Sequence, residues 1–178
     1  EMDVTDEKSI QQASTQLKDI KLNLLINNAG VIARGNVHNE TVQDMTQLYQ
    51  TNVIGTMLVT RYFLPNLLND QTADNPNKII NITSKMGSID LCHNGFNPAY
   101  RCSKAAENML TKLFSNDLKD KNIIVVAMHP GWVQTDMGTN RAPVTVEKSV
   151  NGLLNVINRL TTDDTGKFFG YDRTEIPF

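Results

Sequence analysis

Short apolar runs alternate along this chain with longer segments in which apolar residues recur at helical spacing. The runs cover residues 22–26, 78–82, 123–128 and 167–169. Polar residues that favour a helix start precede the helical segments, which begin after Thr5, near Thr41, near Ala99 and after Thr145. Strands that alternate with helices in this way are typical of βαβ units. The sequence therefore predicts an α/β fold, a doubly wound parallel sheet with helices on both faces.

The size and charge of the chain predict one ordinary globular domain. It has 178 residues, of which 40% are apolar and 20% are charged, and its formal net charge is −2. We therefore expect a single domain over residues 1–178. The polar segment 71–77 is expected to form a surface loop. Because the chain has no long cluster of basic residues, no nucleic-acid partner is expected.

The apolar runs and the cysteines indicate in which cellular compartment the protein is expected. The longest run, 123–128, has six residues, whereas a membrane-spanning helix needs about 20, so no membrane segment is expected. Cys92 and Cys102 are too few for a disulfide scaffold and lack the spacing of metal ligands. We expect a cytoplasmic protein without a metal site, in which Cys102 is a small packing residue.

Small or polar residues follow each of the three strongest predicted strands. They lie at positions 27–30, 83–84 and 129–131. In an open α/β sheet the ligand crevice lies outside the carboxyl ends of the strands, so these three segments are expected to converge on one site.

Tyr100 and Lys104 are four residues apart on a predicted helix, which places both side chains on one face. A nearby cation favours the phenolate, so the pair could release and regain a proton at neutral pH. The spacing alone is weak evidence, because it arises by chance about 0.25 times in a chain of this composition. The plain alternative is a half-exposed tyrosine that packs on the aliphatic stem of a lysine.

The sequence Asn-Asn-Ala-Gly at 27–30 is much rarer, with about 0.006 occurrences expected by chance. Gly30 permits close approach of the backbone, and asparagine amides can hold a ribose or ring edge. An Asx turn that ends a strand is the plain alternative. Asn52 lies in a helical segment beside Gly55, where close packing at the glycine is an equally simple explanation.

Ser84 follows a predicted strand, and its hydroxyl can donate to and accept from a substrate oxygen. A hydrolase would need a base beside this serine, and His38, His93 and His129 are the histidines available. Ser84 does not lie in a Gly-x-Ser-x-Gly motif, which makes a nucleophilic serine the weaker interpretation.

The order of these motifs resembles the short-chain dehydrogenase/reductase superfamily. The residues concerned are the 27–30 motif, Asn52, Ser84, the Tyr100 and Lys104 pair, and the 130–131 motif. Segments 100–106, 129–138 and 166–172 are similar to its C-factor/sniffer-type carbonyl reductase branch. The resemblance spans the whole chain and implies a Rossmann-like sheet. It further implies an NAD(P)H-dependent oxidoreductase that transfers hydride between the nicotinamide and a carbonyl or alcohol substrate.

The resemblance also implies a role for each motif residue. Tyr100 is the general acid in the reducing direction, and Lys104 stabilises its phenolate and binds the nicotinamide ribose. Ser84 polarises the carbonyl, and Asn52 holds a relay water. Besides Tyr100 and Lys104, the residues expected to contact the cofactor are Asp3, Val4, Asn28, Ala29, Gly30, Pro130, Gly131, Val133 and Thr135. The cofactor is NADP or NAD, with NADP preferred. The partners implied are a small-molecule carbonyl compound and, through homo-oligomers, further copies of the chain.

The family's glycine-rich diphosphate loop, Thr-Gly-x-x-x-Gly-x-Gly, does not occur in this sequence. By family likeness the chain starts at the third strand, so we expect a sheet truncated at its N-terminus. The apolar edge at 22–26 would then be open. A non-catalytic binding or signalling protein and an inactive fragment are therefore alternatives to the enzyme. Two tail residues also depart from the branch, Arg173 where it usually has Gly and Phe178 where it usually has Trp.

Overall fold

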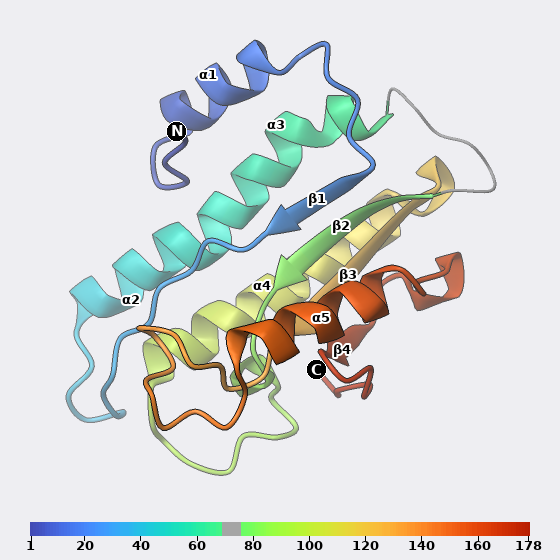
Figure 1. The fold of residues 1–178 in the computed structure, drawn as a ribbon. Helices are drawn as coiled ribbons and strands as arrows, with labels where there is room; N and C mark the ends of the chain where they lie inside the picture. The colour runs from blue at the N-terminus through green and yellow to red at the C-terminus, as the bar shows by residue number, and fades with distance from the viewer. Residues whose placement is uncertain (69–75) are drawn as a thin grey trace.

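The computed structural model describes residues 1–68 and 76–178, and its strands form one parallel sheet (Figure 1). The strand order is β1-β2-β3-β4, with β1 at Leu24–Asn27, β2 at Asn77–Ile82, β3 at Ile123–His129 and β4 at Phe168–Gly170. In the register, Ile26 pairs with Ile80, and Ile80 with Val126. Each predicted apolar run forms a strand whose ends differ from the prediction by at most two residues. The predicted parallel α/β sheet is thus confirmed.

The helices are α1 Glu7–Gln16, α2 Val42–Tyr49, α3 Thr56–Leu68, α4 Pro98–Asp117 and α5 Val146–Ile157. Helices α1, α2, α4 and α5 begin within two residues of the predicted start signals, whereas the separate start of α3 was not predicted. Asp6 caps α1, one residue after the predicted signal, because its carboxylate accepts from the Lys8 backbone N–H. Thr41 forms a capping box with Asp44 at the start of α2. A π-helical turn, Gln50–Gly55, joins α2 to α3 without a break.

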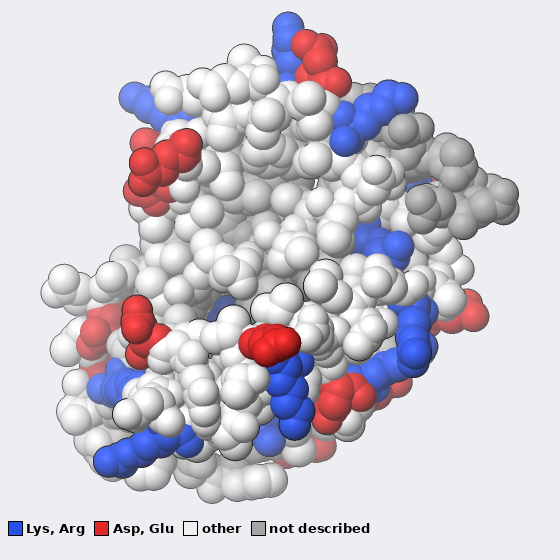
Figure 2. All heavy atoms as spheres, viewed as in Figure 1, with Lys and Arg blue, Asp and Glu red and all other residues white. Residues whose placement is uncertain are grey.

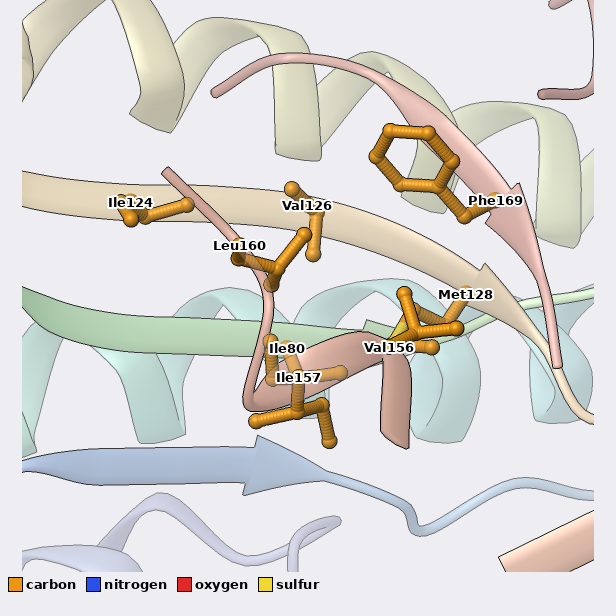
Figure 3. Packing of buried hydrophobic residues seen from close by; sticks show 8 residues of the cluster. All are labelled: Ile80, Ile124, Val126, Met128, Val156, Ile157, Leu160 and Phe169. Carbon is orange, nitrogen blue, oxygen red and sulfur yellow. The ribbon is translucent and has the colours of Figure 1, made fainter. Parts of the chain in front are cut away.

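Helices cover both faces of the sheet. Ile79 packs against Leu67 of α3 on one face, where Phe114 of α4 also contributes. Its neighbour Ile80 points to the opposite face and packs against α5, because successive side chains alternate along a strand. Figure 3 shows this second cluster between the sheet and α5. Outside these layers, α1 packs against α3 (Figure 1).

The edge of the sheet at β1 is open, as the sequence predicts. Within residues 1–68 and 76–178, β1 pairs with β2 alone. Leu24 and Ile26 are 36% and 42% exposed, although they lie on the face where Ile80 is buried under α5. Leu25 points to the other face and packs against the α3 side.

Two local predictions are wrong. Cys102 is exposed, because two residues along α4 carry it from the buried side of Tyr100 to the outer side of the helix. Asn77 is a buried residue of β2 and not part of a surface loop, since its amide donates to the Leu67 carbonyl at 2.7 Å. The rest of the loop predicted over 71–77 lies outside the described residues, except for position 76.

On the face shown in Figure 2, acidic and basic side chains are interspersed along the lower half. Among the helices described, none has both the length and the apolar character needed to cross a membrane.

Candidate active site

A cleft of about 1270 Å³ lies at the carboxyl ends of the strands. The loops that follow β1, β2 and β3 gather at the arrowhead end of the sheet (Figure 1). The predicted site residues that line this cleft are Asn28, Gly30, Ser84, Tyr100, Lys104, Pro130, Gly131, Val133 and Thr135. Segments separated by about a hundred positions in the chain therefore meet in one place, as the parallel sheet requires.

Tyr100 and Lys104 lie on the buried side of α4. They are 7% and 3% exposed, and the Lys104 Nζ is 6.0 Å from the centre of the Tyr100 ring. The ammonium group donates to the Ile82 carbonyl oxygen at 2.9 Å and to the Glu107 Oε2 at 2.6 Å. An ammonium group has three N–H donors, so one remains for the cleft that Lys104 lines.

Glu107 is a residue that the sequence reasoning missed. Its side chain is fully buried one turn after Lys104, and its second oxygen, Oε1, has no hydrogen-bond partner among the described residues. Burial raises the pKa of Glu107 to about 7, although the Lys104 charge acts in the opposite direction. The available signal was its spacing, because Tyr100, Lys104 and Glu107 recur on one side of a helix.

Asn52 supports the cleft from behind. Its side chain is completely buried, its Oδ1 accepts from the Val31 N–H at 2.8 Å, and its Nδ2 donates to the Val31 carbonyl at 3.0 Å. The second Nδ2 hydrogen is donated to the Ser103 hydroxyl oxygen. A Cβ placed on Gly30 would lie 3.4 Å from the Asn52 Oδ1 and 3.5 Å from the Lys104 Nζ. Asn52 thus fixes the turn beside Gly30 but does not line the cleft, and its role with a relay water stays a prediction.

Ser84 is positioned for hydrogen bonding at the end of β2. It is 6% exposed, and its Oγ accepts from the Met86 N–H at 3.1 Å, which leaves the hydroxyl hydrogen free to donate. Among the described residues no histidine hydrogen-bonds to Ser84. His129 reaches the same cleft, but burial and the nearby Lys85 charge lower its pKa to about 4. Nothing in this arrangement favours the hydrolase interpretation.

Three predicted cofactor residues lie apart from the cleft lining: Asp3, Val4 and Ala29. The Asp3 carboxylate accepts from the backbone N–H and the hydroxyl of Thr5, and these bonds lower the pKa of Asp3. Val4 packs on Gly55, where an added Cβ would come within 2.9 Å of the Val4 carbonyl oxygen. Close packing at Gly55 is therefore present, against the Val4 segment and not against another helix. The cofactor contacts of Asp3, Val4 and Ala29 stay predictions.

The loop after β3 forms one wall of the cleft. The Trp132 Nε1 donates to the Gly138 carbonyl at 2.6 Å, which closes a turn within this loop. From the opposite wall, the Arg34 guanidinium donates to the Met137 carbonyl at 3.0 Å. This contact joins the loop after β1 to the loop after β3.

Comparison with known proteins relates this site to a family. The model of the short chain dehydrogenase family matches residues 1–144. The C-signal protein of Myxococcus xanthus is 39% identical over 161 residues, which cover 88% of this chain and 93% of that protein.

Two solved structures have a similar fold. The NADPH-bound carbonyl reductase from chicken fatty liver is 40% identical, with a TM-score of 0.91 over 99% of this chain and 75% of that one. The carbonyl reductase Sniffer of Drosophila melanogaster is 32% identical, with a TM-score of 0.93 over 100% of this chain and 77% of that one.

Proposed function

Since the chain belongs to the short chain dehydrogenase family, we propose that it is an NADPH-dependent reductase that converts the carbonyl group of a small molecule to an alcohol. The family confirms the predicted Rossmann-like oxidoreductase. One observation carries the proposal: Ser84, Tyr100 and Lys104, from two different elements of the fold, line a single cleft. The carbonyl reductases of similar structure, one of them with NADPH bound, support the choice of substrate and cofactor.

The residues of the cleft fit the nicotinamide end of such a cofactor. Lys104 has one N–H that is not used by Ile82 or Glu107, and this donor can bind a ribose hydroxyl. Gly30 lies beside the ammonium group and has no side chain to obstruct the approach of a ligand. Pro130, Gly131, Val133 and Thr135 line the other wall. When bound, the cofactor supplies the hydride.

The side chains of the cleft can donate the proton that the substrate oxygen needs and can stabilise the negative charge that develops during the reaction. The Ser84 hydroxyl donates a hydrogen bond to the substrate oxygen and so polarises the carbonyl bond. The Tyr100 phenol then gives its proton to that oxygen as negative charge develops on it. The Lys104 ammonium, 6.0 Å from the Tyr100 ring centre, stabilises the phenolate that remains.

The decisive experiment combines cofactor binding with turnover. We expect the protein to bind NADPH, followed by fluorescence titration, and to consume it in the presence of aldehydes or ketones. Tyr100→Phe should lower kcat about a thousandfold with little change in NADPH affinity, because the proton donor is lost and the binding groups remain. Tyr62→Phe is the matched control, since the Tyr62 hydroxyl bonds to Glu7 far from the cleft.

A second candidate function is non-catalytic signalling. The C-signal protein, which this chain covers over 93% of its length, favours it. A protein of this kind would neither turn over carbonyl substrates nor respond to Tyr100→Phe. If the protein consumes no NADPH with any substrate of the panel, the reductase proposal is rejected and the signalling candidate gains support.

We also infer the location and assembly of the protein. Cys92 and Cys102 are free and exposed, which supports a reducing, cytoplasmic environment. Met109 and Leu113 of α4 and Tyr49 of α2 are exposed apolar side chains that a second copy of the chain could cover. Light scattering of the purified protein measures the mass of the assembly, and a monomer at micromolar concentration would contradict the homo-oligomer.

A further inference from the structure

A buried ion pair joins Lys104, one of the proposed catalytic groups, to Glu107. The side chains of Lys104 and Glu107 are 4% and 0% exposed, and the Lys104 Nζ is 2.6 Å from the Glu107 Oε2. Burial of two charges is costly unless they are paired and hydrogen-bonded, and here one carboxylate oxygen has no partner in the described chain. The proposed reaction, as derived above, uses Tyr100, Lys104 and Ser84 but gives no role to this carboxylate.

The contacts of Lys104 fix the direction of its remaining donor. The Ile82 carbonyl holds one N–H from the end of β2, and Glu107 holds another from one turn along α4. Because these two hydrogen bonds fix two of the N–H groups, the third can point in one direction only, into the cleft that Lys104 lines. Without Glu107, the bond to the Ile82 carbonyl would be the one remaining hydrogen bond that holds the ammonium group among the described residues.

The carboxylate also changes the charge that Tyr100 experiences. An ionised Glu107 makes the pair neutral overall, which weakens the attraction between Lys104 and the Tyr100 phenolate. A protonated Glu107 leaves the full positive charge of the ammonium group.

We propose that Glu107 is a positioning residue, which orients the Lys104 ammonium group toward the cofactor and moderates the charge with which Lys104 stabilises the Tyr100 phenolate. The inference rests on the proposed reductase function.

Few groups other than Lys104 act on Glu107. Tyr100 lies on α4 itself, and β2 contributes the uncharged Ile82 carbonyl through Lys104. The Thr56 hydroxyl of α3 lies nearby but donates to the Asn52 carbonyl at 3.0 Å. Burial raises the pKa of Glu107 to about 7, so the net charge of the pair changes from positive to neutral as the pH rises through neutrality.

The test compares two substitutions in the full protein. Glu107→Gln keeps the size and a hydrogen-bond acceptor but removes the charge, whereas Glu107→Leu removes both. Asp117→Asn, at the exposed end of the same helix, is the matched control for loss of one negative charge. For each protein the pH profile of kcat and the Kd of NADPH are measured, together with the nitrogen-15 NMR signal of the Lys104 ammonium group.

Different results are expected for the two variants. In Glu107→Gln the alkaline limb of the kcat profile should move about one pH unit lower, because the unopposed ammonium charge favours loss of the phenol proton. The Kd of NADPH should change less than threefold in this variant but rise about tenfold in Glu107→Leu, where a charged hydrogen bond is lost. The wild-type Lys104 signal should shift near pH 7, and this shift should be absent from Glu107→Gln.

The outcomes separate this inference from the proposed function. An alkaline limb in Glu107→Gln that matches the wild type and Asp117→Asn would overturn the role of Glu107, and so would a Lys104 signal without a shift near neutrality. Full activity of Tyr100→Phe would instead reject the reductase proposal. If Glu107→Leu does not fold, Glu107→Gln and the wild-type signal decide the question.

Discussion

The helices α4 and α5 pack on opposite faces of the sheet, and they bury opposite kinds of side chain. The buried side of α5 presents Val156 and Ile157 to a fully apolar cluster that includes Ile80 and Ile124 (Figure 3). The buried side of α4 is largely polar. Its members include Ser103, Lys104, Glu107, Asn108, Thr111 and Ser115.

The apolar face of α5 and the polar face of α4 therefore contribute differently: the first to the stability of the fold, and the second to the positions of individual groups. Apolar contacts are favourable in proportion to the area buried and have no preferred direction. Hydrogen bonds and ion pairs add little net free energy, but they fix where each donor and acceptor lies. The α4 face, with the Lys104 ammonium held by Ile82 and Glu107, therefore fixes the positions of the groups that the proposed reaction uses. The α5 face holds the sheet in its folded form.

The largest expected effect is on the α5 face. Ile124 is completely buried in this cluster, and Ile124→Ala should lower the free energy of unfolding by about 4 kcal/mol, through lost burial and the cavity that remains. The Kd of NADPH should stay unchanged at temperatures where the variant is folded. Urea denaturation measures the loss, with the half-exposed Leu154→Ala on the outer side of α5 as control. A loss no larger than that of the control would contradict the assignment of stability to this face.

The next effect is a pH dependence that belongs to the α4 face. Folding raises the pKa of Glu107 from 4.5 to about 7, so the native state binds more protons than the unfolded state between these values. The stability that Glu107 contributes is complete below pH 4.5 and is lost as the pH rises through 7. The full loss is about 3 kcal/mol at 1.36 kcal/mol per pKa unit.

Glu107→Gln should abolish this dependence. The measurement is the difference in unfolding free energy between wild type and variant at pH 5 and at pH 8. The difference is needed because His129, whose pKa is lowered to about 4, acts in the opposite sense. Its contribution is complete above its ordinary pKa of 6.5 and is lost as the pH falls through 4. Parallel curves for wild type and variant would show that Glu107 is ionised throughout this range.

The two faces also differ in which of their features could be predicted from the sequence. The run 123–128 predicted β3 because strands covered on both sides are largely apolar. The isoleucines of 78–82 predicted β2, although Lys78 and Asn81 lie among them. Tyr100 and Lys104 were predicted as a pair from their spacing. Glu107 was not, because a glutamate three residues after a lysine is indistinguishable from an exposed helical ion pair. Its burial depends on α3 and the end of β2, which are distant in sequence.

The same limit applies to the surroundings of Cys102 and Asn52. The sequence predicted Cys102 as a small packing residue, because the local pattern did not indicate that solvent lies on the side of α4 that carries this residue. Nor did the local pattern indicate that both ends of the Asn52 amide are used by Val31. These outcomes are set by tertiary contacts, which local patterns do not contain.

Two substitutions exchange threonine and valine in opposite directions, one on each helix. The Thr111 hydroxyl accepts from the Asn81 Nδ2 at 2.8 Å and donates to the Glu107 carbonyl at 3.1 Å. Thr111→Val leaves a buried Asn81 donor without a partner and should cost about 2 kcal/mol. Val156→Thr on α5 buries a hydroxyl among apolar groups and should cost a similar amount, about 2 kcal/mol.

Both exchanges should therefore destabilise the protein, although one adds and the other removes a polar group. Urea denaturation at constant pH measures both free energies. If Thr111→Val were neutral or stabilising, the polar interior of α4 would be an ordinary core with no specific network. Activity provides the second distinction, because only the α4 exchange lies on the helix that carries Tyr100.

The smallest expected effect lies outside both faces, in the turn after β4. Arg173 has a φ of 68°, the left-handed conformation that favours glycine. Arg173→Gly should therefore raise the free energy of unfolding by about 1 kcal/mol, less than the full relief of strain because glycine also gains freedom in the unfolded chain. Arg159→Gly, just after the end of α5, is the control, since it removes the same side chain from a residue outside the left-handed region. Since the Arg173 backbone N–H bonds to the Gly170 carbonyl within its own turn, the pH slope assigned to Glu107 should stay unchanged in the Arg173→Gly variant. A gain in stability together with an altered slope would mean that the two faces are coupled through the C-terminal turn, and the separation drawn between them would fail.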